Sequence, residues 1–200
     1  MTNEDQSVRR VTCDSNPVFR RATESHFSEI RSLLVDRLGG SQNALDNWLE
    51  NTQDDTRPES TVVALDSGSV VGFGAMTLCS TECAQRYVGF DVPLSIRREP
   101  VGILHMSAVS RTHESEGIGT KLFNIRLQYL IQNGVKSALG IAWHRKSHHD
   151  SRSLFEKFGF SQFETWERYY ARTNRRGECP DCSDGCSCSA SLYAKNLEFV

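Results

Sequence analysis

A strand, a glycine-containing loop and an amphipathic helix follow one another between residues 102 and 134, and this succession constrains the fold most. The strand is GILHMSAV, and the loop after it, SRTHESEGIGT, ends with Gly117 and Gly119. The helix repeats apolar residues at helical spacing, namely Phe123, Leu127, Leu130 and Ile131. Because the first N–H groups of a helix have no partner within it, the amides from Gly117 to Lys121 are expected to face one anion.

The remaining pattern predicts a mixed α/β domain. Apolar residues at helical spacing after Thr23, stopped by Gly39 and Gly40, indicate a helix. Two apolar runs around residues 66–68 indicate an antiparallel hairpin. Further elements are expected as strands at 17–22, 139–143, 160–171 and 190–200, and as short helices at 43–50 and 151–158. Residues 79–99 show no clear period.

Composition favours one domain. A chain of 200 residues with 38% apolar residues can bury a sizeable core, and its net charge of −2 gives no general attraction to nucleic acid or a membrane. Residues 1–16 are polar and are predicted to form a flexible tail before a single domain at 17–200. No signal peptide or membrane span is recognisable, so we expect a cytoplasmic protein.

The glycine loop and a second segment together resemble the GNAT N-acetyltransferase superfamily. The resemblance rests on SAVSRTHESEGIGTKL and, about thirty residues later, SLFEKFGF, and it covers roughly residues 17–171 plus the last strand. It implies the GNAT fold, with six to seven strands in a mixed sheet and about four helices. In that family the first motif holds the pyrophosphate of acetyl-CoA, and the second is a helix beside the pantetheine and thioester. The implied cofactor-binding residues are Val109, Arg111, Gly117, Ile118, Gly119, Thr120, Lys121, His148 and Phe155.

Two residues depart from the family pattern. Glu114 stands where the family usually has Arg or Gln, and a carboxylate near a pyrophosphate costs on the order of 1 kcal/mol per charge pair in a solvated setting. The backbone donors can outweigh this cost, with the glutamates turned to solvent or offset by Lys121 or Arg111. Phe155 replaces a frequent Tyr whose hydroxyl protonates the CoA thiolate, so another group acts or the thiolate leaves unassisted.

Transfer to an amine also requires a base, because alkyl amines are mostly protonated near neutral pH. His105 shares one strand face with Ser107 and Val109, and an unperturbed histidine pKa of about 6.5 suits this role. LHMSAVSRT also resembles the corresponding strand of arylalkylamine N-acetyltransferases, in which a His at this position belongs to the proton-removal path. A core histidine is the alternative. The resemblance further implies that the backbone N–H around Val109 binds the oxyanion.

Tyr169 and Tyr170 are candidates to protonate the thiolate, with Tyr170 our choice, although both also suit ordinary strand packing. The histidines at 26, 113, 144 and 149 share no spacing that demands a common site, and we expect them at the surface.

Four of the seven cysteines lie within ten residues: Cys179, Cys182, Cys186 and Cys188. Four thiolates satisfy a tetrahedral zinc ion, and the CPxC start is typical of a metal knuckle. They belong to a cysteine-rich insertion at about 172–190, between the last two strands. A structural zinc site is our prediction; disulfides and an ordinary loop are the alternatives, and the sequence cannot choose among three disulfide connectivities.

The sequence therefore predicts an enzyme that transfers an acetyl group from acetyl-CoA to a primary amine in a ternary complex, with His105 as the base. A small amine, an amino acid or a protein amine could be the acceptor, and the oligomeric state is left open. The alternative is a non-catalytic acyl-CoA-binding or metal-responsive module with the same fold, which Glu114 and Phe155 favour and His105 opposes.

Overall fold

The computed structural model describes residues 16–39, 59–89, 91–93, 96–145, 150–173, 179–182 and 185–197. Its strands are β1 (Val18–Arg21), β2 (Glu59–Asp66), β3 (Ser69–Cys79), β4 (Val101–Val109), β5 (Ser137–Trp143), β6 (Ser161–Trp166) and β7 (Ala190–Asn196). Its α-helices are α1 (Phe27–Leu38), α3 (Thr81–Val88), α4 (Ile118–Gln132), α5 (Arg152–Lys157) and α6 (Tyr169–Thr173). Short 3-10 helices precede α1, at Glu24–His26, and α4, at Arg111–His113.

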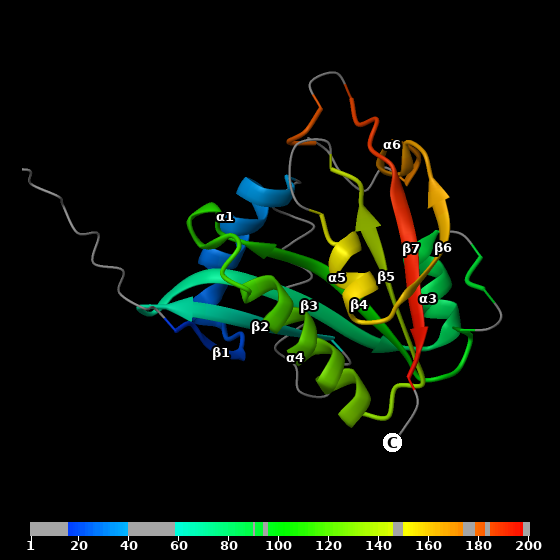
Figure 1. Ribbon diagram of the computed structural model, residues 1–200, viewed down its shortest axis with the longest axis horizontal. Coiled ribbons are helices and arrows are strands. Elements are labelled where there is room, and N and C mark those ends of the chain that lie inside the picture. The colour runs from blue at the N-terminus through cyan, green and yellow to red at the C-terminus, as the bar shows by residue number, and fades with distance from the viewer. Residues whose placement is uncertain are drawn as a thin grey trace, which may run out of the picture.

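The seven strands form one sheet in the order β1-β2-β3-β4-β5-β7-β6. All neighbouring pairs are antiparallel except β4 and β5, which are parallel. The last strand therefore lies between β5 and β6, so the chain completes the sheet only when its C-terminal segment is in place (Figure 1).

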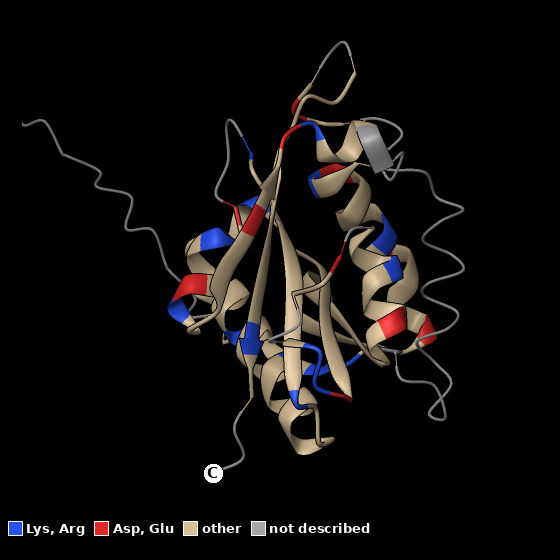
Figure 2. Ribbon diagram, turned by 90° about the vertical axis from the view of Figure 1, so that its right-hand side faces the viewer, with Lys and Arg blue, Asp and Glu red and all other residues tan. Residues whose placement is uncertain are grey.

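Helices cover both faces of the sheet, because each strand alternates apolar side chains between the two faces (Figures 1 and 2). On one face α4 and α5 bury Leu122, Leu127 and Phe155 among the strand residues. On the other face α1 packs through Ile30 and Leu34, and α3 and α6 pack nearby. Burying each large apolar side chain contributes roughly 1.5–3 kcal/mol, so both layers are firmly attached.

β4 and β5 pair only along their first halves. Their register runs from Val101 opposite Ser137 to Leu104 opposite Gly140 and then stops, while β4 continues to Val109. Figure 1 shows the two strands diverging beyond this point, with the start of α4 beside the end of β4. The second half of β4, after Leu104, therefore has no pairing partner in β5, and we call this gap in the strand pairing the opening.

Two expectations for secondary structure were wrong. Residues 81–88 form α3, begun by Ser80, whose hydroxyl accepts a hydrogen bond from the Cys83 N–H, and ended by Gly89 in the left-handed region. The strand expected at 160–171 ends at Trp166, and Tyr169 and Tyr170 lie in α6. The helix expected at 43–50 and all but the last residue of the predicted tail at 1–16 lie outside the described residues.

Candidate active site

The start of α4 presents backbone N–H groups beside the opening. Gly117 is the N-cap residue with φ +79°, a left-handed conformation that glycine adopts most easily. The Lys121 N–H donates to the Gly117 carbonyl at 3.0 Å, which makes it the first amide bonded within the helix. The four N–H groups at residues 117–120 precede it and have no acceptor inside the helix. The expected anion site therefore has four backbone donors, and the Lys121 amide is not one of them.

Gly119 lies between a side chain of β4 and one of α5. A Cβ atom added there would lie 3.8 Å from both Val109 Cγ2 and Leu154 Cδ1, an ordinary contact distance. Ile118 is 3% exposed and its side chain belongs to the core, so it can offer a ligand only its N–H, while Thr120 is half-buried. The Lys121 ammonium group lies over the Phe19 ring, 4.5 Å from its centre.

Glu114 is paired with Arg37 of α1. The Arg37 side chain is 8% exposed, and its Nη2 donates to Glu114 Oε1, so the charge of the carboxylate is balanced by the guanidinium of α1. Arg111 is also turned to α1, with its Nε 3.5 Å from Asp36 Oδ2. The expectation that Lys121 or Arg111 offsets Glu114 was wrong, since Arg37 is the partner; a pairing 77 positions apart leaves no pattern in the sequence.

The N–H of Val109 points into the opening. Ser110 N donates to Val71 O on β3 at 2.8 Å, and amides alternate in direction along a strand, so the preceding amide faces away from β3 toward β5. Because pairing with β5 has already ended at Leu104, no β5 residue pairs with Val109. The Val109 amide and the start of α4 therefore both lie next to the part of β4 that has no pairing partner in β5.

His105 lies on β4 with its ring against α3. Its Nε2 is 2.8 Å from Thr77 Oγ1 on β3, and its ring meets the Tyr87 ring edge-on with centres 4.6 Å apart. The ring therefore lies on the face of the sheet opposite α4 and α5. The histidine is only partly buried.

Phe155 fills the base of the opening. It is 3% exposed, stacks on Tyr193 with centres 5.1 Å apart, and touches Gly140, where an added Cβ would lie 2.5 Å from its Cζ. The Tyr193 hydroxyl lies 3.0 Å from both Glu156 Oε1 and Gln162 Oε1 and donates its one proton to one of them, and burial, together with Glu156, raises its pKa to about 12. The raised pKa makes the Tyr193 phenol a poorer proton donor, so we do not assign it the role of the acid.

Tyr170 is 7% exposed and meets the Trp143 ring edge-on, with centres 5.9 Å apart. Its neighbour Tyr169 donates its hydroxyl to the Val88 carbonyl at 2.9 Å and stacks on Trp166. Tyr169 therefore serves packing. Tyr170 lies at the C-terminal end of β5, on the same face of the sheet as His105.

The acetyltransferase (GNAT) family model matches residues 27–160, which is most of the chain. The chain belongs to the GNAT acetyltransferase family. This confirms the predicted family and fold, and the seven-stranded mixed sheet agrees with them.

Solved GNAT structures share this fold at low sequence identity. A NatC complex bound to Gag peptide and CoA has a TM-score of 0.65 at 17% identity, covering 92% of this chain and 99% of that chain. Arabidopsis thaliana NAA60 with a bisubstrate analogue has a TM-score of 0.68 at 13% identity, covering 90% and 98%. An N-acetyltransferase from Staphylococcus aureus Mu50 has a TM-score of 0.65 at 16% identity, covering 92% and 100%. A comparison with curated proteins gave no match.

The other histidines of this GNAT chain follow their sequence expectations only in part. His148 and His149 lie outside the described residues. The surface expectation was wrong for His26, which is 4% exposed and accepts a hydrogen bond from the Thr23 N–H, whereas His113 is half-buried beside Asp66.

Among the described helices, none has the length and apolar character needed to cross a bilayer.

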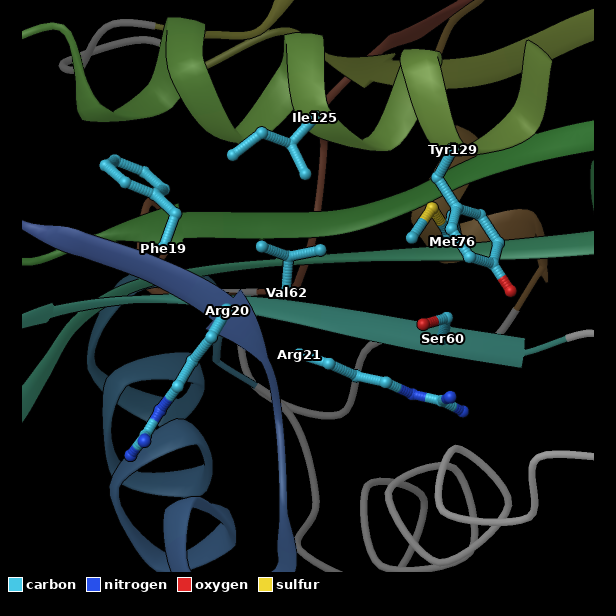
Figure 3. Close-up of a pocket in the computed structure, with 8 residues that line it drawn as sticks. All are labelled: Phe19, Arg20, Arg21, Ser60, Val62, Met76, Ile125 and Tyr129. Carbon is cyan, nitrogen blue, oxygen red and sulfur yellow. The ribbon is translucent and has the colours of Figure 1, made fainter. Parts of the chain in front are cut away.

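A hollow beneath α4 is separate from the opening. Apolar side chains of β1, β2, β3 and α4 surround it, with two arginines at its rim, as Figure 3 shows: Phe19, Arg20, Arg21, Ser60, Val62, Met76, Ile125 and Tyr129. None of the residues expected to bind acetyl-CoA or the amine lines it. We therefore assign it no part in the reaction.

The four clustered cysteines come together beyond α6, before β7. Their Sγ atoms all lie within 4.8 Å of one another, and none of the four forms a disulfide. Cys188 is 3% exposed, and the cluster packs on the face of the sheet that holds Trp143 and Tyr170.

Proposed function

We propose that the protein is an N-acetyltransferase that transfers the acetyl group of acetyl-CoA to a primary amine by direct attack in a ternary complex. The observation that carries this proposal is the divergence of β4 from β5 beside the free amides of α4. On the face of the sheet covered by α4, the opening has backbone amides that can bind an anion. On the opposite face, it has His105.

The diphosphate of acetyl-CoA would bind the N–H groups at residues 117–120. The fit is supported by Gly119, which has no side chain to keep a ligand away from the backbone beside Val109 and Leu154. It is also supported by Glu114, whose charge is balanced by Arg37 and so repels a diphosphate less than an unpaired carboxylate would.

Chemistry would take place where the two faces meet. The amine loses a proton toward His105, its nitrogen attacks the thioester carbon, and the Val109 N–H stabilises the oxyanion that develops. Collapse of this intermediate breaks the carbon–sulfur bond and releases CoA thiolate. Phe155 has no proton to give, so Tyr170 or solvent would supply it.

The acceptor is proposed only as a class, a primary amine on a small molecule or a protein. The structural neighbours include a complex with Gag peptide and a ribosomal-protein-alanine N-acetyltransferase from Brucella melitensis, which is similar to this chain at 17% identity with a TM-score of 0.60. Peptide and protein amines therefore belong in a substrate panel together with small amines. We propose no role for nucleic acid.

The second candidate is a non-catalytic acyl-CoA-binding protein. Phe155 favours it, because the family's usual proton donor is missing at that position. Glu114 no longer favours it, because Arg37 balances the carboxylate.

Calorimetry with acetyl-CoA tests binding, and CoA release with a panel of amines and peptides tests turnover. Gly119→Glu places a side chain and a negative charge in the proposed diphosphate space, so acetyl-CoA affinity should fall at least about tenfold, or 1.4 kcal/mol. Gln128→Glu, with the same charge change at an exposed position of α4, should leave affinity unchanged.

Wild-type binding without turnover on any amine would support the non-catalytic alternative. No binding, or equal binding by both variants, contradicts the proposed diphosphate site.

A further inference from the structure

The sulfur atoms of the cysteine cluster have the spacing of a metal centre. Cys188 Sγ lies 3.9 Å from Cys179 Sγ and 3.6 Å from Cys182 Sγ. A tetrahedral zinc ion with Zn–S bonds of about 2.3 Å places its sulfurs about 3.8 Å apart. A disulfide requires about 2.05 Å. The observed separations therefore fit four ligands around one ion and do not fit a bonded pair.

Backbone geometry and packing help to hold the cluster together. The Cys182 N–H donates to the Cys179 carbonyl at 3.2 Å, so the first two ligands lie on one turn of the chain. Cys188 is 3% exposed and packs against the buried side chains of the sheet, which fixes the last ligand relative to the core.

We propose that Cys179, Cys182, Cys186 and Cys188 bind one structural Zn²⁺, and that this centre holds the loop before α4 in place through two ion pairs joined by a hydrogen bond to the backbone of α1. Four thiols lose their protons as the ion binds. Four sulfur ligands leave no open coordination position, so the ion takes no part in acetyl transfer. The second half of the inference rests on the proposed function, because it concerns the loop that would bind acetyl-CoA.

The first link is Asp181, which lies between two of the metal ligands. Its carboxylate is 2% exposed and accepts hydrogen bonds from Arg145 Nε at 2.9 Å and Nη2 at 2.7 Å. The Arg145 guanidinium also lies over the Trp143 ring, 4.3 Å from its centre. This two-point pairing in a buried setting fixes Arg145 relative to the cluster.

The second link joins Arg145 to α1 and then to the glycine loop. Arg145 Nη1 donates to the Arg37 carbonyl at 2.8 Å, one of the last carbonyls of α1 and otherwise without a partner in the helix. The Arg37 side chain in turn donates to Glu114, three residues before Gly117. Each contact in the chain is made by a side chain that is mostly buried, apart from Glu114.

Metal content is the first test. Protein purified without added metal should contain about one zinc ion per chain, and Co²⁺ exchanged into it should give the charge-transfer and strong visible bands of tetrahedral thiolate cobalt. Cys182→Ser with Cys186→Ser should lose both signals. Cys79→Ser with Cys83→Ser, which removes two thiols outside the cluster, should keep both.

Should the cluster variant fail to fold, cobalt titration of wild-type protein stripped with a chelator gives the same answer. Metal-free folded protein whose four cysteines are disulfide-bonded by mass spectrometry, or which gives no thiolate cobalt spectrum, overturns the metal site.

Hydrogen exchange tests the connection without using activity. Zinc removal should increase amide exchange at residues 111–117 as well as at 179–188. Arg145→Met should keep the zinc but still increase exchange at 111–117, whereas Arg152→Met, which removes a more exposed arginine paired with Asp150, should not. Unchanged exchange at 111–117 in both zinc-free protein and Arg145→Met overturns the connection. Because metal content and exchange are measured without acetyl-CoA, failure of the proposed transferase activity would be seen separately.

Discussion

At the scale of single residues, the groups that contact His105 decide whether its imidazole can act as a base. A histidine on a strand suits both a base and a core position, and the sequence offers no way to decide. The structure places Thr77 Oγ1 2.8 Å from Nε2 and Tyr87 against the ring. The threonine thus influences which ring nitrogen carries the proton, and hence which one can accept a proton from the amine.

Thr77→Val keeps the shape of the side chain but removes this hydrogen bond. Transfer rates should fall several-fold and the pH profile of kcat/KM should shift, while acetyl-CoA affinity is unchanged. Thr77→Ser should restore the profile, because it returns the hydroxyl. His105→Ala should abolish the pH-dependent part of the rate, and an unchanged profile in that variant removes His105 from the mechanism.

At the scale of elements, a β-bulge between β3 and β4 shapes the strand that carries His105. The register shifts between the pairs Gly74–Ser107 and Met76–Leu104, so β4 has one more residue than β3 there. Arg126 of α4, 2% exposed, donates to the carbonyls of Ala75 and His105 at 3.1 and 3.3 Å. Burial lowers the Arg126 pKa to about 10, so this guanidinium remains charged at neutral pH.

Gly74 is the residue that makes room for this arginine. A Cβ atom there would lie 2.7 Å from Arg126 Nε, so Gly74→Ala should lower the free energy of unfolding by about 1–3 kcal/mol, measured in urea. The penalty should shrink in an Arg126→Met background, where the clashing atoms are gone. If the two substitutions change the free energy of unfolding in a strictly additive way, Arg126 is not the cause of the loss seen in Gly74→Ala.

At the scale of the whole molecule, β7 follows the cysteine cluster and joins β6 to β5. Its Ser191 hydroxyl is 2.8 Å from His144 Nε2, beyond the end of β5, and 2.6 Å from Thr165 Oγ1 on β6. Three strands are therefore linked by one row of polar side chains. Desolvation, followed by the charge of Arg152 and opposed in part by Asp150, lowers the pKa of His144 below its ordinary value.

This shift makes folding stability depend on pH. As pH falls below about 6.5, the unfolded chain takes up a proton on His144 before the folded protein does, so stability is full above that pH and declines below it. His144→Gln, which can still hydrogen-bond Ser191, should therefore lose less stability than wild type between pH 8 and pH 5.5 in urea unfolding. Equal losses in the two proteins would contradict a role for His144.

Local patterns predicted much of the fold. The hairpin around residues 66–68, the strand ending at Val109 and the helix that ends before Gly134 follow from alternation, helical spacing and glycine positions, which act over a few residues. The interpretation missed α3, whose buried residues Ala84 and Val88 are four positions apart among mostly polar neighbours, and it failed at Tyr169 and Tyr170, where a turn after Trp166 begins a helix.

The sequence by itself determined the family, the glycines at the start of α4 and the group of four cysteines, because each depends on residue types at close spacing. Only the tertiary structure decided what surrounds them. It brought Arg37 to Glu114, Arg145 to Asp181 and Arg126 to the bulge in β4. These pairs lie 77, 36 and 21 positions apart, so their attraction acts only after the sheet and helices have placed them within a few ångströms.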